Sequence, residues 1–333
     1  QVTSGVQNTL IGGLAGDALT TGGFNTAIGY EALSTEDTGS SNTAFGYQTL
    51  KNLNYNGAGY NTAIGHEAGE LLTTGIRNTL VGALAGDALA AGADNTAVGY
   101  VALSTEDGHG TNVAIGGWAL AVQNAGANAY NVAIGHKAGE AVTTGINNTI
   151  VGGLAGDALT TGQENVVIGT YALRNEDAHG RNVAIGYAAL EAQNAGADAY
   201  NVAVGFIAGN AITTGVQNIL VGALAGDAIL GGSYNVALGH QAGSGITDGD
   251  YNVAIGYKSL LTEDAHGKNV AIGAYALETL NAGADAYNTA IGYNAGYPIT
   301  TGINNTIIGG LAGDAITTGN YNVAVGNHAL GAE

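Results

Sequence analysis

One short pattern of polar, apolar and small residues recurs along nearly the whole chain. Each copy reads Asn, then Thr, Val or Ile, then a residue that is usually Ala, then a large apolar residue, then Gly. The second position is always β-branched, which favours a strand, and the glycine is unfavourable inside a helix. The pattern therefore predicts one short strand per copy. Because strand side chains alternate, we expect the second and fourth residues to point into the fold and the third to point outward.

The copies follow one another at regular intervals. There are 19, separated by 17 residues in fourteen steps and by 19 residues in four. Units of 17, 17, 19 and 17 residues make a 70-residue super-repeat, and the fourth block carries one extra unit. This periodicity predicts an all-β fold, a parallel β-solenoid of 19 coils with 17 or 19 residues each. Since no linker or change of composition interrupts the repeat, we expect one continuous domain over residues 1–333.

The motif asparagines are expected to have a structural role. Stacked Asn side chains form hydrogen-bonded ladders along the axis of a solenoid, and Asn tolerates turn conformations. The predicted ladder consists of Asn8, Asn25, Asn42, Asn61, Asn78, Asn95, Asn112, Asn131, Asn148, Asn165, Asn182, Asn201, Asn218, Asn235, Asn252, Asn269, Asn288, Asn305 and Asn322.

Residues 25–33 read Asn-Thr-Ala-Ile-Gly-Tyr-Glu-Ala-Leu. This segment resembles the head repeats of trimeric autotransporter adhesins. It is still more similar to the Asn-Thr-Ala-Ile-Gly repeats of bacteriophage tail fibres and bacterial surface proteins. The resemblance extends over residues 8–330. It implies a left-handed parallel β-roll, often trimeric, in an extracellular fibre at a cell or virion surface.

Composition excludes several classes of function. The chain has 26 acidic and 7 basic residues and a net charge of -19, which would repel nucleic acid. It contains no cysteine, so disulfides, thiolate catalysis and Cys-zinc sites are excluded. No run of 18 apolar residues is present, and no membrane span is expected. Phosphate-binding loops and the common hydrolase motifs are also missing from the sequence, so we expect no enzyme activity and no cofactor.

A Glu-Asp-x-His sequence is the best candidate for a metal site. Hard carboxylate oxygens would suit calcium, although a solvated acidic loop is the more ordinary interpretation. The related loop at Glu36 and Asp37 lacks the histidine. The candidate ligands are Glu106, Asp107 and His109; Glu176, Asp177 and His179; and Glu263, Asp264 and His266.

Two features suggest self-association. The third motif position is bulky once per block, and on an outward face these residues would form an apolar stripe for a partner chain. They are Leu10, Leu80, Ile150, Leu220 and Ile307. Neither end resembles a polar cap, and the seven residues before the first motif and the twelve of the last unit together make one 19-residue coil. This suggests open ends that stack end to end through Gln1 and Glu333.

These observations favour a non-catalytic structural protein that associates with itself in an extracellular fibre or surface appendage. The alternative is a receptor- or glycan-binding shaft of a phage tail fibre or bacterial adhesin, since tyrosines cluster on both sides of the motif and the two-residue insertions project once per block. The partners would then be the protein itself and a surface glycan or protein.

Overall fold

The computed structural model describes residues 2–331, and the chain divides into two compact units, Gln1–Glu164 and Asn165–Glu333. Every regular element among residues 2–331 is a β-strand or a bridge, and no helix occurs in that range. The predicted all-β parallel solenoid is therefore confirmed. The prediction of one continuous domain over residues 1–333 stays a prediction.

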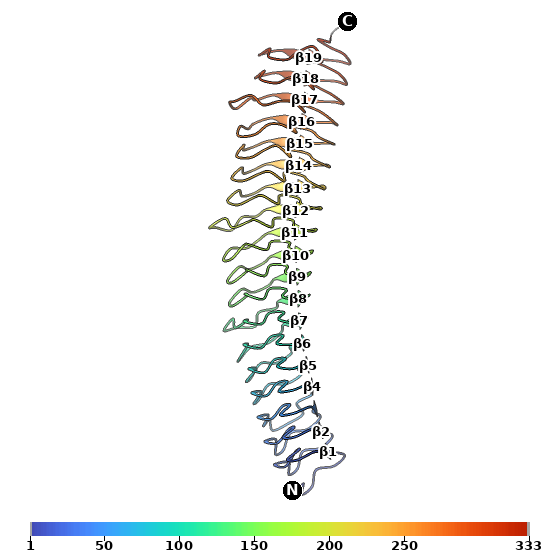
Figure 1. The fold of residues 1–333 in the computed structure, drawn as a ribbon, viewed down its shortest axis with the longest axis vertical. Helices are drawn as coiled ribbons and strands as arrows, with labels where there is room; N and C mark the ends of the chain where they lie inside the picture. Colours follow the sequence, from blue (N-terminus) through green and yellow to red (C-terminus); the bar gives the residue numbers. More distant parts are fainter. Residues whose placement is uncertain (1, 332–333) are drawn as a thin grey trace. The chain divides into compact units, whose positions relative to one another are not determined.

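The first unit contains nine strands, each formed by the second to fourth residues of the motif. Each strand pairs in parallel and in register with the next, so that Thr26 lies beside Thr43 and Ala27 beside Ala44. Figure 1 shows these strands stacked one above another. They are β1 (Thr9–Ile11), β2 (Thr26–Ile28), β3 (Thr43–Phe45), β4 (Thr62–Ile64), β5 (Thr79–Val81), β6 (Thr96–Val98), β7 (Val113–Ile115), β8 (Val132–Ile134) and β9 (Thr149–Val151).

The second unit repeats this arrangement with ten strands, again parallel and in register. The remainder of each coil is turn, closed by hydrogen bonds to the coils on either side. The strands are β10 (Val166–Ile168), β11 (Val183–Ile185), β12 (Val202–Val204), β13 (Ile219–Val221), β14 (Val236–Leu238), β15 (Val253–Ile255), β16 (Val270–Ile272), β17 (Thr289–Ile291), β18 (Thr306–Ile308) and β19 (Val323–Val325).

The predicted orientation of the strand side chains is wrong. The third motif residue is buried, as Ala27 and Ala63 illustrate, whereas the second and fourth residues are partly or fully exposed. The physical reason is the small interior of the coil. The inner face of the strand lies close to the opposite turn, and a methyl group is all that most coils accommodate there.

The bulky third-position residues are therefore core residues and do not form an outward stripe for a partner chain. Leu80, Ile150, Leu220 and Ile307 have no exposed surface, and Leu10, near the start of the chain, is partly buried. The other two residues predicted to mediate self-association, Gln1 and Glu333, lie outside the described residues.

Leu80 shows how the core admits a larger side chain. A Cβ atom built on Gly69 would lie 2.7 Å from Leu80 Cδ1, and one built on Gly86 would lie 2.8 Å from Leu80 Cδ2. In β2, where the third residue is an alanine, the turn instead contributes Leu33, which is fully buried. In β4 the third residue, Ala63, and the turn residue Gly69 are both small, and Leu80 of the next coil lies against Gly69. Small residues thus make room for a large side chain of the same coil or of the neighbouring one.

The motif glycine is required by the distance between coils. Gly65 has a φ of 143°, which L-residues rarely adopt, and a Cβ atom there would lie 2.4 Å from the carbonyl oxygen of Gly82 in the next coil. Non-glycine residues also take left-handed conformations at fixed points of the coil, including Tyr60 at 51° and Val101 at 58°. Hydrogen bonds between coils hold this backbone in place at many of these residues, as where the Val101 N–H donates to the Ala83 carbonyl at 3.1 Å.

The reversed orientation leads to a direct test in the first unit. We expect Leu80→Ala to lower the free energy of unfolding by about 2–5 kcal/mol, because it leaves a cavity that Gly69 and Gly86 do not fill. Ile64→Ala, on the exposed side of β4, should cost less than about 1 kcal/mol. Urea unfolding followed by circular dichroism measures both. A larger loss for Ile64→Ala than for Leu80→Ala would contradict this assignment of the interior.

Candidate functional site

The motif asparagines form the predicted ladder. Asn61 Oδ1 accepts a hydrogen bond from the backbone N–H of Asn78 in the next coil at 3.0 Å, and Asn61 Nδ2 donates to the Gly75 carbonyl at 3.0 Å. The same pattern recurs from Asn8, which is partly buried, through the buried asparagines that follow it in the first unit. Because each Oδ1 is bonded to the backbone N–H of the next asparagine, the ladder is structural, although the Asn112 side-chain amide nitrogen has no hydrogen-bond partner.

A row of core residues on the turn side contains four glutamates. Most coils place an aliphatic residue seven positions after the motif glycine, such as Leu19 or Leu72, and these side chains are fully buried. Once per block a glutamate occupies this position, and all four have no exposed surface: Glu36, Glu106, Glu176 and Glu263. A carboxylate at an aliphatic core position is costly unless it is bonded, so each of them requires a physical explanation.

Glu36 links its own coil to the two-residue insertion of the next coil. Glu36 accepts the Gly39 N–H at 2.6 Å and the Tyr55 N–H at 3.1 Å, and Tyr55 belongs to the insertion of the following coil. Both oxygens of Glu36 are therefore satisfied. The carboxylate supplies the acceptors that the widened backbone of the 19-residue coil needs.

The three loops that contain histidine differ from the Glu36 loop. Glu106 Oε1 accepts the His109 N–H at 3.3 Å and Glu176 Oε1 accepts the His179 N–H at 3.1 Å. Oε2 of each of these glutamates is buried and has no hydrogen-bond partner, and the same is true of both carboxylate oxygens of Glu263. Nδ1 of the histidine in each loop is also buried and without a partner.

The structure brings together every predicted metal ligand within its own loop. One ligand atom from each of the three residues lies within 4.8 Å of the other two in all three loops. Nδ1 of His109 lies 3.8 Å from Glu106 Oε1, and Nδ1 of His179 lies 3.5 Å from Glu176 Oε1. The glutamate closes the inner side of each cluster, and the histidine is about one-third exposed at its outer side.

Burial dominates the electrostatics of these clusters. Desolvation raises the pKa of the Glu106 and Glu176 carboxyl groups, against the opposing effect of nearby backbone N–H groups. Desolvation, together with the neighbouring Asp264 carboxylate, raises the pKa of Glu263 to about 7. A cation in such a cluster would favour the ionised carboxylates.

Each insertion packs against the loop that contains the glutamate. The Gly180 N–H donates to Asp198 Oδ1 at 3.1 Å, and Arg181 forms an ion pair with the same aspartate. The corresponding loop of the next block places the Gly267 N–H 3.2 Å from Asp285 Oδ1, and Lys268 pairs with Asp285. The glutamate, the histidine loop and the insertion therefore form one connected structure in each block.

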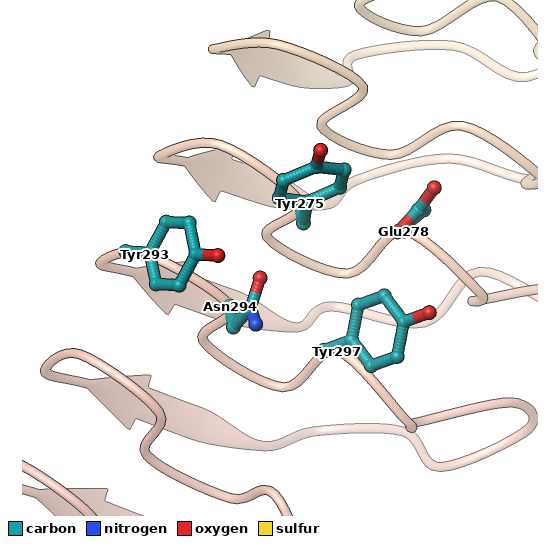
Figure 2. Close-up of a pocket in the computed structure, with 5 residues that line it drawn as sticks. All are labelled: Tyr275, Glu278, Tyr293, Asn294 and Tyr297. Atoms are coloured by element: carbon teal, nitrogen blue, oxygen red, sulfur yellow. The ribbon is translucent and has the colours of Figure 1, made fainter.

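A separate pocket of about 280 Å³ lies in the second unit and is lined by Tyr275, Glu278, Tyr293, Asn294 and Tyr297. Figure 2 shows the three tyrosine rings around Asn294, with side chains from two neighbouring coils. The rings of Tyr275 and Tyr293 meet edge to face, with centroids 6.0 Å apart. Asn294 Oδ1 is buried and has no hydrogen-bond partner. The sequence indicated tyrosine-rich edges but did not identify this pocket, because Glu278 and Tyr297 belong to no repeated motif.

No protein-family model matches the chain, and comparisons with curated proteins and with solved structures also find no match. Among residues 2–331, no helix is long and apolar enough to cross a membrane.

Removing a ladder side chain should destabilise the first unit. We expect Asn61→Ala to cost about 1–3 kcal/mol for each buried group left without a partner, namely the Asn78 N–H and the Gly75 carbonyl. Asn54→Ala, at an exposed position, is the matched control and should change stability by no more than about 0.5 kcal/mol. Urea unfolding midpoints give the comparison, and equal midpoints for the two variants would show that the ladder does not stabilise the fold.

Proposed function

We propose that this chain is a non-catalytic structural protein that forms an extracellular fibre or surface appendage by self-association. The observation that carries the proposal is the outward face of the strands. This sheet face consists of the second and fourth motif residues: the fourth is apolar in every strand, and the second is Thr in nine strands and Val or Ile in the other ten. None of the 19 strands contains a charged residue. Phe45, Ile134 and Ile219 are 50%, 38% and 45% exposed. Extended apolar surface of this kind is typical of an interface.

Aromatic side chains border the sheet face. Tyr60 and Tyr130 precede the motif asparagine and are exposed. After the motif glycine, Tyr30 stacks on Tyr47 with ring centroids 5.7 Å apart. These stacks extend the apolar surface beyond the strands and pre-order it, which lowers the entropy lost when a partner binds.

A second copy of the chain is the partner that best fits the sheet face. Its own face is equally apolar and uncharged, and its strands repeat at the same spacing of about 4.8 Å, so that side chains remain in step over many coils. A groove of about 490 Å³ lined by Tyr200, Val202, Gln217 and Ile219 offers a place for an apolar side chain of that copy. Lateral packing, including a trimer, follows from this face, and end-to-end stacking is the other mode of self-association.

Self-association is tested with two matched triple variants. Phe45→Lys, Ile134→Lys and Ile219→Lys place charge on the sheet face, and Leu71→Lys, Val122→Lys and Leu230→Lys place the same charge at exposed apolar positions outside the strands. By mass photometry and light scattering, we expect the wild type and the second variant to form oligomers and the first to be monomeric, because lysines in the interface would be buried without partners.

Three results would contradict this proposal. The first is a wild type that remains monomeric at high micromolar concentration. The second is an equal loss of assembly in the two triple variants, and the third is a sheet-face variant that still forms oligomers. In the last case negative-stain images that show chains joined only at their ends would assign self-association to end-to-end stacking.

The tyrosine pocket supports a second candidate function, a glycan-binding shaft. Aromatic rings pack against the apolar faces of sugars, while Asn294 Oδ1 and the Glu278 carboxylate offer acceptors to hydroxyl groups. The pocket is formed by side chains of neighbouring coils, and its rings are held by their edge-to-face contact.

A glycan array followed by titration calorimetry tests this candidate. We expect Tyr293→Ala with Tyr297→Ala to weaken binding of any captured glycan by about tenfold or more, since about 1.4 kcal/mol of lost contact corresponds to tenfold. Tyr30→Ala with Tyr100→Ala removes two exposed tyrosines from the same position of other coils and should leave affinity unchanged. An array without a captured glycan, or equal losses in both variants, would exclude glycan binding at this pocket.

A further inference from the structure

We propose that three loops of this chain each bind one divalent transition-metal ion of the zinc type, through the carboxylates of Glu and Asp and the Nδ1 atom of His. The sites are Glu106, Asp107 and His109; Glu176, Asp177 and His179; and Glu263, Asp264 and His266.

Each of the three loops leaves buried ligand atoms without hydrogen-bond partners. Glu106 has no exposed surface, yet its Oε2 receives no hydrogen bond. Nδ1 of His109, in the same loop, is also buried and has no hydrogen-bond partner. The corresponding atoms of Glu176 and His179 are in the same state. Buried polar atoms are nearly always satisfied, so a repeated failure at the same two atoms indicates a missing ligand. A cation is the ligand that accepts lone pairs from a carboxylate oxygen and from an imidazole nitrogen together.

The Glu36 loop can be compared directly with the three loops that contain histidine. This loop has Gly39 at the position of the histidine. There both glutamate oxygens are hydrogen-bonded, to the Gly39 and Tyr55 N–H groups, and neither is left over. A buried glutamate can therefore hold the insertion by itself. Among the four glutamate loops, carboxylate oxygens without a hydrogen-bond partner occur only in the three that also contain a histidine.

The geometry and ligand types favour zinc over calcium. Two ligand atoms about 2.0–2.1 Å from a tetrahedral zinc ion are about 3.4 Å apart. His179 Nδ1 and Glu176 Oε1 are 3.5 Å apart, and the His109 and Glu106 atoms are 3.8 Å apart. An aspartate oxygen lies within 4.8 Å of both atoms in each loop and supplies the third ligand. Calcium takes six to eight oxygen ligands, and imidazole nitrogen is a ligand of transition metals.

Charge supports the same assignment. Two carboxylates and a neutral imidazole give each site a charge of about -2, which a divalent ion balances. A bound ion would join the outer loop to the glutamate that lies beside the insertion of the next coil, and would thereby stiffen the widest part of each block.

The test is to count bound ions in the full chain and in two matched triple variants. His109→Gln, His179→Gln and His266→Gln remove the proposed nitrogen ligands. His66→Gln, His136→Gln and His240→Gln remove the same number of histidines from exposed positions after the motif glycine. Each protein is stripped with a chelator, dialysed against zinc and analysed for metal by mass spectrometry, with circular dichroism to verify the fold. Cobalt absorption spectra report coordination directly.

We expect three zinc ions per chain in the wild type and in the control variant, and none in the loop variant. Cobalt should give a visible absorption band in the first two proteins only, and excess calcium should not displace it. A wild-type chain without retained zinc overturns the proposal. So does an unchanged ion count in the loop variant, a fourth ion that indicates binding at the Glu36 loop, or displacement of cobalt by calcium.

Discussion

The small interior of each coil is the constraint on which the rest of the structure depends. Backbone hydrogen bonds between coils fix the spacing along the stack, and a 17-residue coil leaves room inside for only a few alanine and aliphatic side chains. The buried Ala63, the glycines around Leu80 and the glycine at the end of each strand all follow from this limit. Larger apolar residues are displaced to the outer face, which is why the sheet presents isoleucine and valine to its surroundings.

The same limit determines where chemistry can occur. A core row that is aliphatic in most coils contains Glu106 and its equivalents once per block, and the adjacent coil is wider by two residues. The Glu36 carboxylate accepts a hydrogen bond from that wider backbone, and burial raises the pKa of Glu106. Buried polar groups inside a thin solenoid thus bond to the backbone of the neighbouring coil. Ligands can approach at the edges where a coil is longer by two residues.

Much of the architecture was predictable from particular residues. Asn, a β-branched residue and Gly at fixed intervals located every strand, and the chemistry of Asn led to the buried ladder seen at Asn61. Within each Glu-Asp-x-His loop, the three candidate ligands also lie close to one another. The tyrosine pocket was not predictable, because Asn294 and Tyr297 come together with Tyr275 only through the stacking of two coils. The left-handed backbone at residues such as Val101 had no sequence signal, since β-branched residues disfavour it.

By itself, the sequence determined the period, the parallel pairing and the identity of the stacked residues, because these depend only on the regular recurrence of residue types. It did not determine which side of the strand is the interior. Alternation places the second and fourth residues on one face and the third on the other, and both assignments satisfy that pattern equally. The tertiary structure decided between them, because the choice depends on the volume enclosed by the strand and the opposite turn. That volume buries Leu80 and its equivalents and leaves the β-branched face outside.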